Sequence, residues 1–233
     1  MRWNALGIAV LAALAAQARA GILTPTDQFR SVEASASVTE GETEVMDSQS
    51  LSAPGFGLFD EAVSALASLG DPNDAVAGRG AADQLSGFLP TMTFGNGTAA
   101  ADTDLSPDGR APNGFGLSVF SATIMLDADT PYDMTGSLEM SSAGGGSGIA
   151  SVVFEGPGGV LIEEESLDGT VPFGASGLLV SGEYTIDIFV VAEANAAGAE
   201  AAGSFDFELT LIPEPGSAAS LLLGAFWLRR ARG

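Results

Sequence analysis

The 233-residue chain contains no cysteine, no histidine and no lysine, so all eight of its basic residues are arginines. Without cysteine it has no disulfides, no thiolate metal sites and no thiol redox switch. Without histidine it has no imidazole acid–base group and no Ser-His-Asp triad. The absence of lysine excludes Schiff-base chemistry and a P-loop. Any catalysis would therefore depend on carboxylates, hydroxyls or a metal held by carboxylates.

Positive charge is scarce, and the formal net charge is −22 with a pI near 4.1. A surface this acidic repels the phosphate backbone, so we expect no nucleic-acid partner. Residues 21–212 hold 29 acidic residues and three arginines, a formal charge of −26. The other five arginines all lie in the two terminal segments: Arg2, Arg19, Arg229, Arg230 and Arg232.

The first 20 residues have the parts of a secretory signal peptide. A charged start at Arg2 is followed by an apolar stretch over residues 5–16 and by the small residues Ala18 and Ala20, two positions apart. The apolar stretch is shorter than the roughly 20 residues that a transmembrane helix needs. The pattern predicts an N-terminal signal helix, cleavage by a signal peptidase between Ala20 and Gly21, and export from the cytoplasm.

The last 21 residues combine an extended strip, a short apolar stretch and a basic end. Pro213, Glu214 and Pro215 hold the backbone extended and deny it helical hydrogen bonds, which leaves a strip that a protease can engage. Residues 218–228 are largely apolar, and they predict a short hydrophobic helix. The arginine cluster after it, Arg229, Arg230 and Arg232, would stay cytoplasmic. Because a durable span needs about 17 residues or more, the pattern favours transient membrane insertion.

This tail resembles the PEP-CTERM sorting signal of Gram-negative bacteria, in which Pro-Glu-Pro, an apolar stretch and an arginine cluster follow in this order. The resemblance implies that an exosortase, a membrane-embedded cysteine transpeptidase-like enzyme, removes the tail during export. Such proteins typically accompany exopolysaccharide production and biofilm or floc formation. The resemblance therefore implies a protein of the cell envelope or extracellular matrix that is transiently anchored in the inner membrane. The short apolar stretch is the one departure from the pattern.

Residues 21–212 have the pattern of an all-β domain, an antiparallel β-sandwich or jelly roll. Glycine, at 31 of 233 residues, is about twice as frequent as usual, which suits many tight turns. The clearest strand is 204–211, where Phe205, Phe207 and Leu209 alternate with polar residues. The N-terminal part, residues 21–112, carries fewer such signals. Further strands are expected at 32–38, 117–126 (a central strand), 132–140, 149–154, 160–162 and 183–191, with a flexible loop at 144–146.

Residues 59–69 fit either a helix or a strand. The spacing of Phe59, Val63 and Leu66 fits a helix, whereas the many small residues between them fit a strand equally well. The run from Gly177 to Tyr184 resembles the G-x-L-x-x-G-x-Y strand-entry pattern of PEP-CTERM proteins. In those proteins the equivalent of 59–69 is usually extended, which favours a strand.

Two acidic loops have a spacing that would offer oxygen ligands to calcium. Neither has the third alternating ligand or the bidentate glutamate of an EF-hand, and aspartate is also common in solvated turns. Ordinary turns are the favoured interpretation, calcium is the alternative, and no other cofactor is predicted. The candidate ligands are Asp102, Asp104 and Asp108 in the first loop and Asp127, Asp129 and Asp133 in the second.

The run Glu163-Glu164-Glu165 contains the carboxylates that a glycosidase would require. Those two carboxyls must lie roughly 5–10 Å apart across a cleft, but adjacent strand residues point to opposite faces. We therefore interpret the run as a charged strand edge that discourages aggregation. A metal-dependent hydrolase that used Asp102 or Asp127 is the least favoured hypothesis, and we predict no enzyme activity.

The sequence predicts a non-enzymatic exported surface or matrix protein that an exosortase sorts and processes. The alternative is a carbohydrate-binding module that binds exopolysaccharide with the help of calcium. Divalent cations would be needed because an acidic polysaccharide is repelled by an acidic surface. Since Trp3 and Trp227 both lie in the sorting segments, a stacking face on the body would have to use Tyr132, Tyr184 or phenylalanines.

Overall fold

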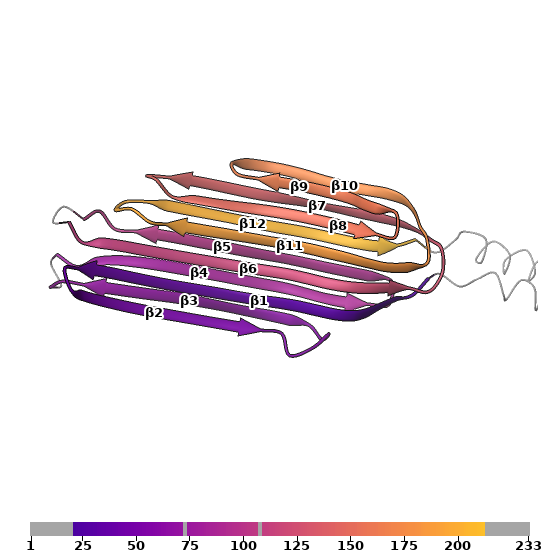
Figure 1. Cartoon of the computed structure of the whole chain (residues 1–233), viewed down its shortest axis with the longest axis horizontal. Helices are drawn as coiled ribbons and strands as arrows, with labels where there is room; N and C mark the ends of the chain where they lie inside the picture. Colours follow the sequence, from indigo (N-terminus) through magenta and orange to yellow (C-terminus); the bar gives the residue numbers. More distant parts are fainter. Residues whose placement is uncertain (1–20, 72–73, 107–108, 213–233) are drawn as a thin grey trace, which may run out of the picture.

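The computed structural model describes residues 21–71, 74–106 and 109–212, which form two six-stranded antiparallel sheets packed face to face (Figure 1). Sheet A contains, in spatial order, β2 (Thr43–Ser52), β1 (Leu23–Glu40), β6 (Ala111–Leu126), β11 (Gly182–Ala194), β8 (Ser147–Gly156) and β9 (Gly159–Ser166). Sheet B contains β10 (Gly169–Leu179), β7 (Thr130–Ala143), β12 (Glu200–Leu211), β5 (Met92–Thr103), β4 (Val76–Leu89) and β3 (Phe59–Leu69). The predicted all-β sandwich is confirmed. The two flanking helices expected from the sequence fall outside the described residues.

The strands predicted from alternating hydrophobicity are present. In β12, Phe205, Phe207 and Leu209 are buried, whereas Asp206 and Glu208 are exposed. The predicted central strand is β6, which pairs with β1 on one side and β11 on the other. The ambiguous segment 59–69 is strand β3, which pairs with β4 along its whole length. The preference for a strand over a helix at this segment was therefore correct.

The core between the sheets has two parts. The larger part is filled by aromatic and branched side chains of β6, β7, β8, β11 and β12, and the rings of Phe120 and Phe207 are in contact with centroids 4.8 Å apart. The smaller part lies between β1, β3 and β4 and contains residues such as Val32, Phe59 and Val63. Burial of these side chains is the main force that holds the two sheets together.

Several glycines allow the sheets to approach until their backbones touch. A Cβ atom at Gly80 of β4 would lie 2.0 Å from the carbonyl oxygen of Phe115, and one at Gly114 of β6 would lie 2.0 Å from that of Arg79. The high glycine content was expected to serve tight turns. That expectation was incomplete, because these glycines are in strand interiors and leave the space that the opposite backbone fills.

The strands all run along the long axis of the molecule, so the connections lie toward one of its two ends (Figure 1). The exception is the turn at residues 167–168, which lies nearer the middle of the long axis because β9 and β10 are short (Figure 1). We use the name terminal end for the end that holds residues 21–22, 53–58, 90–91, 127–129, 157–158, 180–181 and 212. We use the name distal end for the opposite end, which holds residues 41–42, 70–71, 74–75, 104–106, 109–110, 144–146 and 195–199.

Candidate functional site at the terminal end of the sandwich

Most residues predicted to carry the sorting function lie outside the described part of the chain. They are Ala18 and Ala20 of the signal-peptide cleavage site and Pro213, Glu214, Pro215, Arg229, Arg230 and Arg232 of the tail. Gly21 and Ile212 are the described residues that adjoin them, and both lie at the terminal end (Figure 1). Both ends of the described chain, where the two predicted processing junctions would begin, therefore lie at one end of the body.

The chain enters the sandwich along a tightly held path. The backbone N–H of Gly21 donates to Thr130 Oγ1 at 3.0 Å, and that of Ile22 donates to Asp127 Oδ1 at 2.8 Å. Leu23 N–H donates to the carbonyl oxygen of Pro90 at 2.9 Å. Gly21 is buried, and a Cβ atom there would lie only 2.2 Å from Thr130 Oγ1, so the entry point fits glycine.

The chain leaves the sandwich beside the same two connections. Leu211 N–H donates to the carbonyl oxygen of Thr91, and Ile212 N–H donates to that of Pro131, each at 2.8 Å. Residues 90–91 and 127–131 thus hold both the first and the last described residues. The two junctions are adjacent on one end of the molecule.

The neighbouring connection between β10 and β11 is fixed to this site by two hydrogen bonds. Ser181 N–H donates to Asp129 Oδ1 at 2.8 Å, and the Tyr184 hydroxyl donates to the carbonyl oxygen of Val180 at 2.7 Å. Burial raises the pKa of Tyr184 and of nearby Tyr132, so both hydroxyls are neutral at physiological pH. These hydrogen bonds fasten the β10–β11 connection to the β6–β7 connection and to the start of β11.

Several large apolar side chains are exposed at the terminal end. Its exposed large hydrophobic side chains are Ile22, Phe56, Leu58, Leu89, Val180, Ile212 and, on the last residues of β10, Leu178. The acidic residues in the described connections of this end are Asp127 and Asp129, and both accept backbone hydrogen bonds. Exposed apolar side chains that gather in one region of a soluble domain commonly mark a contact surface.

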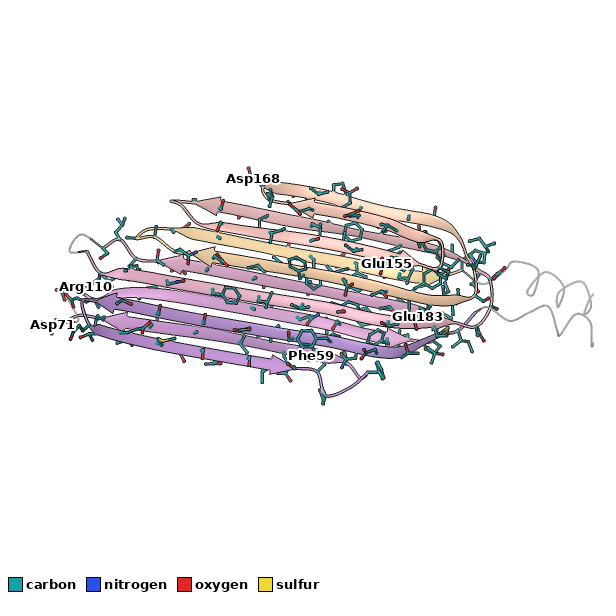
Figure 2. All side chains as sticks on the ribbon, viewed as in Figure 1. Phe59, Asp71, Arg110, Glu155, Asp168 and Glu183 are labelled. Atoms are coloured by element: carbon teal, nitrogen blue, oxygen red, sulfur yellow. The ribbon has the colours of Figure 1, made fainter. Side chains whose placement is uncertain are left out.

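The connections of the distal end are more acidic. They contain Glu42, Asp71, Asp74 and Asp104, and Figure 2 shows Asp71 and Arg110 at this end. Arg110 Nη1 donates to the carbonyl oxygens of Leu69 and Asp74 at 2.7 and 2.8 Å, which ties two distal connections together. The described connections are therefore more acidic at the distal end than at the terminal end, where most of the exposed apolar side chains of the connections gather.

The first proposed calcium loop is organised around an arginine. Arg79 Nη1 lies 2.6 Å from Asp102 Oδ1 and 2.9 Å from Asp104 Oδ1, and these hydrogen bonds raise the pKa of Arg79. Asp104 also accepts a hydrogen bond from Ala77 N–H at 3.1 Å. Asp108 falls outside the described residues. The carboxylates of Asp102 and Asp104 thus already have protein partners.

The three aspartates of the second proposed calcium loop have different structural roles. Asp127 and Asp129 bind backbone amides of the terminal end, while Asp133 is exposed on strand β7 and does not lie in a loop. Within the described ranges, no group of three or more acidic side chains is arranged to hold a metal ion. Calcium binding at these residues stays a prediction.

The sequence analysis did not identify Arg30, although it is among the largest fully buried side chains. Its guanidinium donates to the carbonyl oxygens of Gly57 and Ser86 at 2.9 and 3.1 Å and lies over the ring of Phe88 at 5.1 Å. Desolvation by burial lowers its pKa. The one available signal was a single arginine two residues before the predicted strand 32–38, since 21–78 contains no other basic residue.

Two further features bear on the alternatives. Glu163, Glu164 and Glu165 are exposed on β9, which is an edge strand of sheet A. A shallow depression of about 370 Å³ lies on sheet B between β5 and β12, and its lining includes Phe94, Asn96, Asp206 and Glu208. It offers an aromatic ring and polar groups, which are the chemistry that a bound sugar uses, together with two carboxylates that would repel an acidic one.

No protein-family model and no curated protein matches the chain. Among solved structures, the chain is similar to one described as "Structure of infectious bursal disease virus Gt strain". The two are 12% identical, the match covers 86% of this chain and 68% of that chain, and the TM-score is 0.18. A likeness this weak supports no conclusion about fold or function. No helix in the described part of the chain is long and apolar enough to cross a membrane.

Proposed function

We propose that this chain is a non-enzymatic exported surface or extracellular-matrix protein that an exosortase sorts and processes. The observation that carries the proposal is the order of Pro213-Glu214-Pro215, an apolar stretch and an arginine cluster, in a chain that starts with a signal peptide. In this proposal, the signal helix and the short C-terminal hydrophobic helix flank the sandwich. Signal peptidase and exosortase are its partners during export. In the extracellular matrix of its Gram-negative host, the protein is surrounded by exopolysaccharide.

The geometry of the terminal end supports this function. Ile212 is the last residue with a described hydrogen bond to the body, and the processing motif starts at the next residue. Cleavage at 213–215 would therefore remove the tail without cutting any of the twelve strands. Because Gly21 and Ile212 lie at the same end, a chain held by its tail would project its acidic distal end away from the membrane.

A direct test replaces Pro213, Glu214 and Pro215 together by alanine in the native host. We expect the variant to keep its arginine tail and to remain in the membrane fraction, while the parent protein is shortened and released. Glu183→Ala is the matched control, because Glu183 is exposed at the same end but lies outside the motif. Processing of the triple variant like the parent, or an unchanged protein in a host without exosortase, would refute the proposal.

The carbohydrate-binding module is the alternative, and the depression lined by Phe94 and Asn96 is the observation that favours it. A glycan array with and without calcium tests it. Binding that disappears in Phe94→Ala would support the alternative, and a blank array in both conditions would count against it.

A further inference from the structure

The short path from the body to the apolar tail limits where the terminal end can lie. Only five residues, 213–217, separate Ile212 from the apolar stretch that begins at Ala218. The steps from Ile212 to Ala218 span at most about 20 Å when fully extended. While the tail is inserted, the terminal end must therefore stay close to the headgroup layer of the same membrane. This step rests on the proposed function.

Several of the side chains that this geometry would bring to the membrane are large and apolar. Ile22 and Leu89 are exposed next to the entering chain, which the hydrogen bond from Leu23 to Pro90 holds against the connection after β4. On the other side of the β6–β7 connection, Ile212 binds the backbone of Pro131, and Leu178 is the strand partner of Pro131. These exposed residues come from both sheets and surround the two junctions.

The distribution of charge favours the same orientation. The described connections of the terminal end contain two carboxylates, and each accepts a backbone N–H. Four acidic residues lie in the described connections of the distal end. A body with a formal charge of −26 is repelled by anionic lipid, and this repulsion is weakest when its acidic end points away from the bilayer.

We infer that the terminal end docks on the bilayer that holds the tail, with Ile22, Leu89, Leu178, Val180 and Ile212 reaching into the interfacial layer. A second copy of the chain fits this surface poorly as an occupant. A second copy would cover the point at which each chain leaves its body after Ile212, and it would therefore obstruct both tails. The bilayer is the partner that the tail itself brings to this surface.

The absence of tryptophan from residues 21–212 allows a clean fluorescence test. The starting protein runs from Gly21 to Gly233, retains all twelve strands and carries Trp227→Phe. Leu178→Trp then places a reporter at the terminal end, and Leu167→Trp places one in the β9–β10 turn, at the opposite end of these two strands. The two leucines are matched in exposure, at 60% and 61%. Each protein is reconstituted into phosphatidylcholine vesicles with brominated or unbrominated acyl chains.

We expect bromine to reduce the emission of the reporter at position 178 at least about twofold and to leave the reporter at position 167 unchanged. Equal emission changes at the two positions in vesicle-bound protein would overturn this inference and leave the sorting proposal standing. Failure of the protein to float with the vesicles would overturn the membrane step of the sorting proposal and this inference with it.

A second pair of variants separates docking from tail insertion. With a reporter at Leu89→Trp, the double change Leu178→Asp and Val180→Asp should abolish the quenching while the tail still holds the protein on the vesicles. The control, Leu105→Asp at the distal end with Leu167→Asp in the β9–β10 turn, should not alter it. Circular dichroism checks that each variant is folded. Undiminished quenching in the terminal-end variant would contradict the inference.

Discussion

At the scale of single residues, Arg30 is a buried positive charge that binds neutral oxygen atoms, although the protein is highly acidic. The hydrogen-bond acceptors of its guanidinium are neutral oxygens, among them the carbonyls of Gly55 and Gly57 in the connection after β2. Its side chain also lies over the rings of Phe59 and Phe88. Arg30 therefore attaches an otherwise irregular loop of the terminal end to the core.

We predict that Arg30→Ala lowers the free energy of unfolding by about 3 kcal/mol, because several buried carbonyl oxygens lose their donor. Arg79→Ala is the control. Since Arg79 and its partners Asp102 and Asp104 are each more than one-third exposed, solvent screening should limit its effect to about 1 kcal/mol or less. Urea unfolding measures both. Equal losses would mean that Arg30 does not hold the loop as described.

A second residue-scale prediction concerns alkaline pH. Burial raises the pKa of Tyr132 and Tyr184 above the ordinary value of 10.0, so the folded state holds these protons more tightly than the unfolded state. Their contribution to stability is complete below about pH 10 and is lost as pH rises through the raised values. Thermal melts between pH 8 and 11.5 should show a drop in Tm above pH 10. Tyr132→Phe should show a smaller drop, and an unchanged one would contradict this explanation.

At the scale of elements, the sequence was most informative where one face of a strand is buried. The alternation in 183–191 and 204–211 predicted both strands and their buried residues, because a period of two directly reports which side faces the core. In 59–69 the same signal was weak, since small residues bury little area in either conformation. Pairing with β4 decides the outcome there, and that partner is not contained in the local sequence.

Glycine at the interface between strands β4 and β6 leads to an element-scale prediction. Gly80→Ala would place a methyl group 2.0 Å from a backbone oxygen, so the sheets would have to separate locally. We expect a loss of about 2–3 kcal/mol in the free energy of unfolding, as for other overpacked interiors. Gly158→Ala is the control, because no atom lies within 4 Å of the added group. Denaturant titration of the two variants compares them.

At the scale of the whole molecule, the sequence predicted two layers of strands but not their order. Which strands pair depends on contacts between residues far apart in the chain, such as β1 with β6 and β12 with β5. The same long-range order brings Gly21 and Ile212 to one end and separates an apolar end from an acidic one. The candidate site is therefore a property of the topology, although its sorting motif was visible in the sequence.

The calcium hypothesis illustrates the same limit. Regular spacing placed Asp102 and Asp104 together with Asp108 in one expected loop. Spacing alone did not reveal that Arg79, on the neighbouring strand β4, forms ion pairs with both Asp102 and Asp104. Arg79 is paired with Asp102 across β4 and β5, 23 residues away in the chain. Such a partner becomes evident only when the register of the strands is known.

The central claim is that this chain is exported and then processed at both ends. The most direct test is the intact mass of the protein recovered from the medium and envelope of its native host. The account predicts a species that starts at Gly21 and ends near residues 213–215, with any further mass located at its new C-terminus. A species that still contains Arg229 to Gly233 would contradict it.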